Sequence, residues 1–409
     1  MTMNPLTKTC CAVTVVIILL SASIALSAEK GKTNPVTQYW MSVATQNTSI
    51  PGMSQEGMSG IQGMIIGKMA GIGPKRSLLL QLNSPRTRPP DPEATHDIPP
   101  GLNMGKTLPL LTPEREKPVH GEEPEGKMEK PKVRMLFYWG CAETVRSGQP
   151  KVLDTEKMSM VDFGKAMSGR SGSAQHPPSM RTGWAYAEWP NKKDHTDVPQ
   201  SGSLQGDHFI HGNYPPDIKF IIGEKHDFMA PVEFTSTSGG LTDSITFQWK
   251  KIPTAIGYFA MAIGHNEKSG ETIIWSSSDA QEPGYGLMTY LSPDDVSRFI
   301  KEKVVMGSGV TSCSIPKGIF KDAKGAALQF IGYGDELNIA YPPKPQNSTK
   351  PHEYIWAMKL RNKSTGMLPL GQDEIKDSKK KQDEQPTGEK PAGAPEQMKK
   401  ALDKIKDLF

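Results

Sequence analysis

Histidine and carboxylate side chains gather in one short stretch of this 409-residue chain. Imidazole and carboxylate groups are ligands that zinc and copper accept readily in proteins. The stretch offers His208, His211, His226 and Asp227 as candidate metal ligands. If residues 209–210 lie in a strand, His208 and His211 point to opposite faces, because successive strand residues alternate in direction. The alternative is that these histidines only bond to backbone carbonyls, and the sequence leaves both interpretations open.

A second candidate site consists of three aromatic residues, Trp184, Tyr186 and Trp189, in an expected strand at 183–189. Exposed aromatic rings on a β-sheet are how sugar-binding modules stack against pyranose rings. Large aromatic side chains also dominate the energetics of hydrophobic cores. The same residues therefore predict either a ligand-binding platform for sugars or a part of the core.

Sulfur-containing residues give two further hypotheses. Cys141 and Cys313, the cysteines outside the first 28 residues, could form a disulfide in an oxidising compartment or remain two buried thiols. The chain also has 21 methionines. Methionine thioethers select Cu(I), but methionine also fills irregular gaps in cores. Apart from Cu or Zn, these patterns predict no cofactor.

The sequence lacks the short motifs of common enzyme chemistry. It contains no G-x-S-x-G elbow, Walker A loop, dinucleotide fingerprint, H-E-x-x-H or C-x-x-C motif. These absences favour a protein without catalytic activity, although a glycoside hydrolase needs only two carboxylates whose sequence spacing is free. With 48 basic and 44 acidic residues, the formal net charge of +4 gives no sign of nucleic-acid binding.

The first 28 residues have the pattern of a secretory signal peptide. Cys10–Leu20 is apolar but too short for a permanent membrane span, and Ser21–Ala28 supplies the small residues of a cleavage site. The mean hydropathy of −0.48 excludes a protein with many membrane spans. We therefore expect a periplasmic or extracellular protein.

The next two regions differ in composition. Residues 29–73 are rich in methionine and glycine and predict a flexible segment. Residues 74–131 begin with one expected strand at 77–82 and continue with many prolines, which exclude helices and central strands. This proline-rich part is either a linker or an extended segment that packs Ile98, Leu102 and its other apolar residues along a β domain.

Short strands separated by turn residues predict a β-rich domain over residues 132–231. A loop rich in Gly, Ser and Met interrupts it at 167–180. The expected strands lie at 133–139, 149–154, 183–189, 209–210 and 218–222.

Residues 232–343 form a second unit with clearer strands. Phe247 and Trp249 share one face of an expected strand, and a turn through Gly257 leads to Tyr258. Trp249, Gly257 and Tyr258 resemble the pattern of fibronectin type III modules. The resemblance implies a β-sandwich that serves in binding or spacing.

Other features of this second unit complete its predicted plan. An inserted helix at 292–305, capped by Ser292, departs from the fibronectin type III pattern. The expected strands lie at 245–250, 258–263, 271–276, 287–291, 311–315 and 327–333.

The end of the chain is polar. Residues 344–394 predict a disordered linker, because they offer almost nothing to bury. Residues 395–409 predict a docking helix, which would rest on the protein's own body, on a partner or at a membrane surface. Its apolar stripe consists of Met398, Leu402, Ile405 and Phe409.

Together these patterns predict a mainly β fold with two β-sandwich-like domains, one inserted short helix, disordered extensions and a C-terminal amphipathic helix. The expected function is non-enzymatic binding or a structural role in the cell envelope, with a protein or glycan partner. The alternatives are a glycan-active hydrolase or sugar-binding protein, and a copper or zinc binding protein. No nucleic-acid partner is expected, and the terminal helix allows a peripheral membrane contact.

Overall fold

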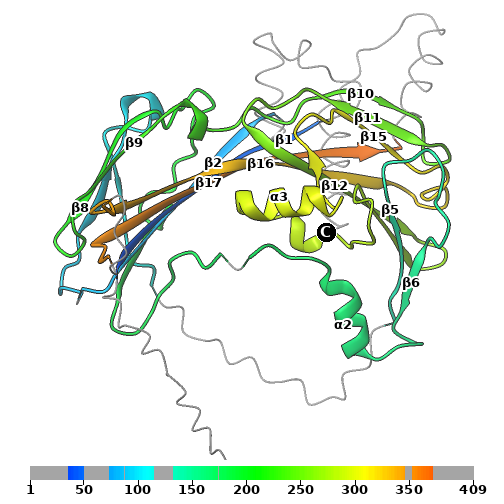
Figure 1. Ribbon diagram of the computed structural model, residues 1–409, viewed down its shortest axis with the longest axis horizontal. Helices are drawn as coiled ribbons and strands as arrows, with labels where there is room; N and C mark the ends of the chain where they lie inside the picture. Colours follow the sequence, from blue (N-terminus) through cyan, green and yellow to red (C-terminus); the bar gives the residue numbers. More distant parts are fainter. Residues whose placement is uncertain are drawn as a thin grey trace, which may run out of the picture. The chain divides into compact units, whose positions relative to one another are not determined.

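The structure is mainly β, with far more strand than helix, as the alternating sequence patterns predict (Figure 1). The computed structural model describes residues 36–49, 73–86, 88–114, 132–173, 175–345 and 352–371. These residues all belong to one unit, Pro35–Phe409. The predicted signal peptide at 1–28 and the predicted helix at 395–409, with Met398, Leu402, Ile405 and Phe409, lie outside the described residues.

A ten-stranded main sheet runs through the described unit. Its pairs are antiparallel except for β1 with β17 and β13 with β5, which are parallel. The short strand β14 (Met306–Gly307) pairs with β12 beside the main path. In spatial order the main path is β6 (Lys151–Asp154), β5 (Arg134–Trp139), β13 (Glu271–Ser276), β12 (Ala255–Asn266), β16 (Ala326–Tyr341), β17 (Trp356–Leu370), β1 (Thr37–Thr48), β2 (Lys75–Ser84) and β7 (Ala185–Trp189).

Two smaller sheets pack on one face of the main sheet, which we call the front face. Strand β17 contributes to both contacts: Trp356 and Leu360 lie in one core and Leu368 in the other. The first small sheet is β4 (Thr107–Pro109), β3 (Ala94–Asp97), β8 (Gly206–Gly212) and β9 (Ile218–Ile222). The second is β10 (Phe234–Ser238), β11 (Ile245–Trp249) and β15 (Ser312–Ile315).

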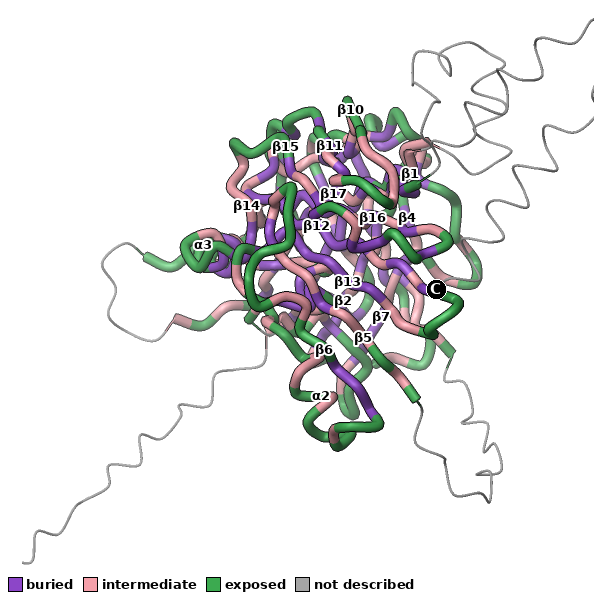
Figure 2. The backbone as a smooth tube through the Cα atoms, turned by 90° about the vertical axis from the view of Figure 1, so that its right-hand side faces the viewer, coloured by how far each residue is buried: buried purple, intermediate pink, exposed green. Residues whose placement is uncertain are grey.

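The opposite, back face of the main sheet carries a third core. Alternate residues of β12 divide between the two faces: Tyr258 and Ala260 point to the front core, and Phe259 and Met261 to the back core. Helix α3 (Pro293–Lys301) covers the back core with Phe299 and ends before residue 305, the predicted end. Ser292 caps it as predicted, with its hydroxyl accepting from the Asp295 amide. Helix α2 (Met160–Ser168) buries none of its residues, and Figure 2 shows it pink and green.

Three short 3-10 helices complete the described elements. They are η2 (Pro100–Leu102), η3 (Glu224–His226) and η4 (Tyr285–Leu287).

The segment between β9 and β10 connects the two small sheets across the front face. Its residues 227–233, which we call the crossing segment, form no strand, so their carbonyl groups need partners from outside a β-ladder. Buried polar side chains of β1 and β17 supply these partners. Thr45 donates to Met229 O, Asn47 to Val232 O and Asn362 to Asp227 O.

Glycine lets the crossing segment lie close to the sheet. A Cβ at Gly366 of β17 would come within 2.7 Å of the Val232 side chain. Real Cβ atoms essentially never approach so closely, so a larger residue would push the segment away from the sheet. Two residues in the middle of β17 therefore accommodate the crossing segment: Asn362 bonds to it and Gly366 gives it space.

Two predictions about flexible regions are wrong. Residues 37–48, expected to belong to a flexible segment, form β1, and residues 356–370, expected to be a disordered linker, form β17. In both strands polar residues such as Asn47 and Asn362 occupy core-facing positions, which hides the apolar alternation. The rest of the predicted flexible and linker regions lies largely outside the described residues.

Other local predictions divide between right and wrong. The strands at 218–222 and 271–276 are confirmed at those bounds. The strand expected at 287–291 is wrong: this stretch follows η4 as a loop. In the proline-rich region, the prediction that prolines exclude central strands is wrong, because β3 pairs with β4 on one side and with β8 on the other. The described residues of this region pack along the β structure, with Ile98 and Leu102 in the core beside β3.

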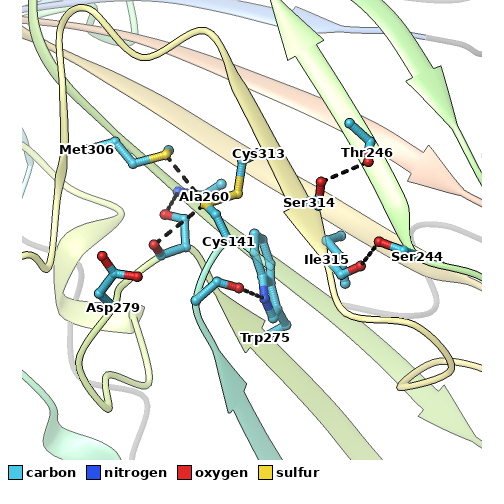
Figure 3. Close-up of a disulfide and its surroundings, with 12 residues drawn as sticks. Cys141, Ser244, Thr246, Ala260, Trp275, Asp279, Met306, Cys313, Ser314 and Ile315 are labelled. Carbon is cyan, nitrogen blue, oxygen red and sulfur yellow. Dashed lines mark hydrogen bonds between the residues drawn. A yellow bond between two sulfur atoms is a disulfide. The ribbon is translucent and has the colours of Figure 1, made fainter. Parts of the chain in front are cut away.

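A disulfide joins Cys141, just after β5, to Cys313 of β15 (Figure 3). Of the two states left open for these cysteines, the structure has the bonded one. The bond links the main sheet to the second small sheet and connects the regions that were expected to form separate domains. Strand β5, from the first of those regions, also pairs directly with β13 from the second.

Removing this disulfide should destabilise the protein, because the bond closes a loop with a sequence separation of 172 residues. We expect Cys141→Ser with Cys313→Ser to lower the free energy of unfolding by about 2–5 kcal/mol in denaturant titrations. Under reducing conditions the wild-type protein should approach the double variant. Equal stability of the two proteins without reductant would contradict this prediction.

The hydrogen bonds to the crossing segment can be tested with Asn47→Ala. This variant leaves the buried Val232 carbonyl without its partner, so we expect a loss of about 1–3 kcal/mol in the free energy of unfolding. The control is Gln248→Ala, at an exposed position of β11. A change in Asn47→Ala no larger than in the control would show that these hydrogen bonds do not stabilise the fold.

Candidate functional site

His208 lies on the buried side of β8, where it joins a chain of hydrogen bonds. Its Nδ1 lies 2.9 Å from Nε2 of His96, and Nδ1 of His96 lies 2.8 Å from the Tyr39 hydroxyl. At the other end, Nε2 of His208 lies 2.7 Å from the carbonyl oxygen of Leu204. Tyr39, His96 and His208 are all buried.

The partners fix the direction of this chain. The Leu204 oxygen only accepts, so His208 donates from Nε2 and, when neutral, accepts at Nδ1. His96 then donates from Nε2 and accepts the Tyr39 hydroxyl proton at Nδ1. Burial lowers the pKa of both histidines, and for His96 the neighbouring His208 lowers it further. With both rings neutral, every ring nitrogen is paired, and no imidazole lone pair is left for a metal ion.

The other predicted metal ligands lie elsewhere. His211 is on the opposite side of β8, as its spacing from His208 predicts, with Nε2 3.2 Å from Asp97 Oδ1. His226 ends η3. Burial favours a higher pKa for the Asp227 carboxyl, but the hydrogen bonds that it accepts lower the pKa overall. The donors are Ser203, Leu204, Gln205 and Phe228.

The structure therefore does not bring His208, His211, His226 and Asp227 together. In the part of the chain that the structure describes, no group of three or more His, Cys, Asp or Glu side chains is placed to hold a metal ion.

The three predicted sugar-binding residues do not form an exposed row. Trp189 is only 1% exposed and belongs to the core between the main sheet and the first small sheet. Tyr186 is buried and donates its hydroxyl to Glu188 at 2.6 Å. Trp184 precedes β7, half-buried, with the Arg181 guanidinium 5.5 Å from its ring centroid. Trp189 therefore matches the core interpretation, whereas Tyr186 is buried outside the three cores.

A different set of aromatic and charged residues meets on the back face. Lys359, Arg361 and Lys363 alternate along β17 and point to this face, because the intervening residues Leu360 and Asn362 are buried on the front. The neighbouring strands place Trp40 beside Lys359 and Glu336 beside Arg361. We call Trp40, Tyr290, Lys359, Arg361 and Lys363 the basic aromatic face.

Two aromatic rings lie among the three cations. The Trp40 centroid is 5.5 Å from Lys359 Nζ and 5.4 Å from Arg361 Cζ. Tyr290, in the loop before α3, lies 4.3 Å from Arg361 Cζ and 4.6 Å from Lys363 Nζ. Its hydroxyl donates to the Val43 carbonyl at 3.2 Å, which fixes the ring over the sheet. Burial raises the pKa of Tyr290 to about 12, although Arg361 acts to lower it.

A shallow groove of about 310 Å³ adjoins this face over the ends of β16, β17 and β1. Trp40 and Lys359 line it together with the amide side chains Gln38 and Asn338. The groove therefore combines one indole ring with hydrogen-bonding groups and a cation.

Positive charges outnumber negative charges on the basic aromatic face. Glu336, whose side chain is 4% exposed, pairs with Lys359 and accepts from Gln175. Arg361 donates from Nε to the Ser42 hydroxyl at 2.8 Å. Among the described residues, neither Arg361 nor Lys363 forms an ion pair with a carboxylate. The face thus holds three cations and one buried carboxylate.

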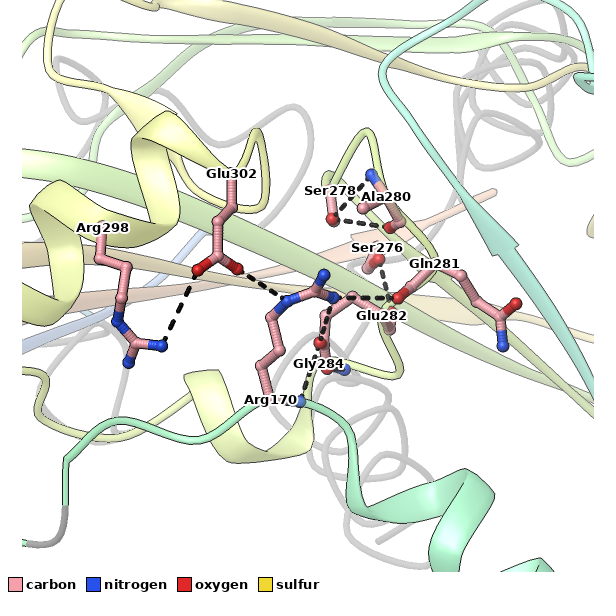
Figure 4. A network of polar contacts seen from close by, with 9 residues as sticks. All are labelled: Arg170, Ser276, Ser278, Ala280, Gln281, Glu282, Gly284, Arg298 and Glu302. Carbon is pink, nitrogen blue, oxygen red and sulfur yellow. Dashed lines mark hydrogen bonds and ion pairs between the residues drawn. The ribbon is translucent and has the colours of Figure 1, made fainter. Parts of the chain in front are cut away.

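A second extended segment, described at 169–173 and 175–179, runs across the back face from α2 (Figure 1). Figure 4 shows its anchor: Arg170 contacts Glu302 Oε2 at 3.0 Å and Glu282 Oε2 at 3.4 Å, and Arg298 reaches the other oxygen of Glu302. Farther along, Gln175 reaches Glu336. The segment therefore borders the basic aromatic face on one side.

Comparisons with known proteins supply no relative. No family model matches the chain, no curated protein matches it, and no solved structure is similar to it. No helix within the described residues is long and apolar enough to cross a membrane. Function must therefore be argued from the geometry of the site.

The residues of the basic aromatic face were not among the sequence-based candidates. A signal was present in β17, where Lys359, Arg361 and Lys363 recur at every second position between core-facing residues. Such a row on one face of a strand differs from the irregular charges of a disordered linker. Trp40 and Tyr290 carried no comparable signal, because only the strand pairing and the loop before α3 bring them beside β17.

The buried histidine chain predicts a loss of stability in mild acid. Both folded-state pKa values lie below the unfolded value near 6.5, so as the pH falls the unfolded chain takes up protons first. Stability is thus fully present above about pH 6.5 and declines below it, by up to about 1.4 kcal/mol per pH unit for each histidine. Urea titrations at pH 7.5 and pH 5 measure this decline.

Two variants identify the source of the pH dependence. His96→Gln with His208→Gln should flatten the dependence between these pH values, even if the variant is less stable overall. The exposed His195→Gln should keep the wild-type dependence. The same slope in all three proteins would contradict the assignment to His96 and His208.

Proposed function

We propose that this protein is a secreted or periplasmic, non-enzymatic binding protein of the cell envelope, and that its ligand is a glycan held at the basic aromatic face. The observation that carries the proposal is Trp40 beside a groove lined by Gln38, Asn338 and Lys359. A flat ring suits the apolar face of a sugar, and side-chain amides and an ammonium group suit its hydroxyls. Binding grooves commonly combine an aromatic wall with a few polar groups in this way.

The carboxylates of the face favour binding over hydrolysis. Glycoside hydrolysis ordinarily uses two carboxyl groups on either side of the scissile bond. Glu336 is the one carboxylate among the described residues next to the cations of β17, and Lys359 and Gln175 already engage it. A buried carboxylate engaged in this way is a poor nucleophile or general acid. The hydrolase alternative therefore has less support at this face than the binding function.

The location is proposed from the signal-peptide pattern, and the Cys141–Cys313 disulfide supports it, because structural disulfides are typical of oxidising compartments. The predicted helix at 395–409 remains a candidate for contact with an envelope partner or a membrane surface.

We also propose that the fold consists of two sandwich-like units that share the main sheet. One is formed where β10, β11 and β15 face β13, β12 and β16, with Trp249 and Tyr258 in the core between them. This arrangement supports the fibronectin type III-like resemblance. The other forms where the first small sheet faces β17, β1 and β2.

The glycan proposal predicts that Trp40→Ala weakens binding. A glycan array on the purified protein would identify the bound oligosaccharides, and titration calorimetry on the best of them would give the affinity. We expect the variant to weaken binding at least about ten-fold, which corresponds to about 1.4 kcal/mol.

The matched control is Trp184→Ala, which removes a half-buried indole outside the groove and should leave the affinity unchanged. An array without any bound glycan would reject the proposal. Equal affinities of the wild-type protein and Trp40→Ala would reject the site at the basic aromatic face. Loss of binding in Trp184→Ala alone would indicate that the sugar binds at the residues near β7.

A further inference from the structure

We propose that Arg361 and Lys363, together with the ring of Tyr290, form an anion subsite next to the Trp40 groove, which takes a carboxylate, sulfate or phosphate group of the ligand. The inference rests on the proposed glycan-binding function and narrows it to acidic glycans. Its geometry, however, can be tested without any sugar.

The first argument is the position of the two cations around one ring. Arg361 Cζ and Lys363 Nζ lie 4.3 Å and 4.6 Å from the centroid of Tyr290. The ring attracts both groups through its electron-rich face, and its own hydroxyl is already used by Val43. Two positive groups are thus held near each other by a neutral side chain.

The second argument is that this arrangement destabilises the protein when no anion is bound. Arg361 and Lys363 are half-buried and both positive, and neither forms an ion pair with a carboxylate among the described residues. Glu336, opposite Arg361 on β16, attracts Arg361, and no such carboxylate attraction is found for Lys363 among the described residues. Burial lowers the pKa of Lys363, and the charge of Arg361 lowers it further. Charges withdrawn from water are destabilising unless they are paired. An oxyanion between the two cations would remove this penalty.

The third argument is the supply of donors. Among the described residues, Arg361 donates from Nε to the Ser42 hydroxyl and its terminal NH₂ groups have no hydrogen-bond partner, so they can donate to a ligand. The planar guanidinium suits the paired oxygens of a carboxylate or phosphate, and the Lys363 ammonium adds a second charge-assisted hydrogen bond. A neutral sugar hydroxyl would gain much less from this pair.

The fourth argument connects the subsite to the groove. The Arg361 guanidinium lies 5.4 Å from the Trp40 ring centroid, so it borders both Trp40 and Tyr290. A sugar ring stacked on Trp40 would bring an acidic substituent within reach of Arg361. Glu336 is the nearby carboxylate on β16: it pairs with Lys359 and attracts Arg361 without an ion pair to it, so the donors of Arg361 and Lys363 can still meet the ligand.

The test uses sodium phosphate as the probe, compared with sodium chloride at equal ionic strength. We expect phosphate to raise the melting temperature of the wild-type protein and calorimetry to give a measurable Kd. Arg361→Gln and Lys363→Gln should each weaken phosphate binding at least ten-fold. In chloride, Lys363→Gln should melt no lower than the wild type, because it removes the unpaired charge.

The control is Lys151→Gln, at an exposed position of β6 far along the sheet order from β17, which should respond to phosphate as the wild type does. The inference is overturned if phosphate has no effect beyond that of chloride. It is also overturned if Arg361→Gln and Lys363→Gln respond to phosphate like Lys151→Gln.

Oligosaccharides distinguish this inference from the proposed function. A uronate oligosaccharide should bind more tightly than its neutral counterpart, and Arg361→Gln should abolish the difference. Equal, Trp40-dependent binding of both sugars would reject the anion subsite and keep the glycan function. Phosphate binding that needs Arg361 and Lys363, without binding of either sugar, would keep the anion subsite and reject the glycan function.

Discussion

Hydrogen bonding of the crossing segment is the constraint on which the arrangement of the sheets depends. Residues 227–233 carry the chain from one small sheet to the other over the main sheet, and the carbonyls of Asp227, Met229 and Val232 accept from side chains and not from a β-ladder. Asn47 and Asn362 supply the donors, and Gly366 supplies the space. An apolar residue at either asparagine would leave a carbonyl without its partner. The front face of β17 therefore has to be apolar at both ends and polar in the middle.

Strand β17 combines core packing on its front face with a row of cations on its back face. Its front-facing residues follow the two cores and the crossing segment, and its back-facing residues form the row of cations beside Trp40 and Tyr290. Because successive strand residues alternate, the two patterns are interleaved residue by residue and do not interfere. The basic aromatic face is thus built on a central strand, where the backbone is held on both sides by β16 and β1.

The sequence pattern predicted most strands of residues 132–341, because apolar alternation there is bounded by clear turns. It missed the largely exposed β10 and the two-residue β14, and it wrongly placed a strand at 287–291. The cap of α3 at Ser292 was also predictable from local chemistry. Strands β1 and β17 were missed for one reason: buried Asn47 and Asn362 serve a segment far away in sequence, which a local pattern cannot reveal. The candidate site was missed with them, since Trp40 and Lys359 become neighbours only through the parallel pairing of β1 with β17.

The parallel pairing of β1 with β17 also bears on the order in which the chain can fold. Strand β17 fills the position between β16 and β1, and its residues lie more than 300 positions after those of β1. Until residue 370 is available, β1 and β16 both have an unpaired edge, and each front core lacks one wall. Contacts so distant in sequence form slowly. The main sheet can therefore close only after residues 356–370 have been synthesised.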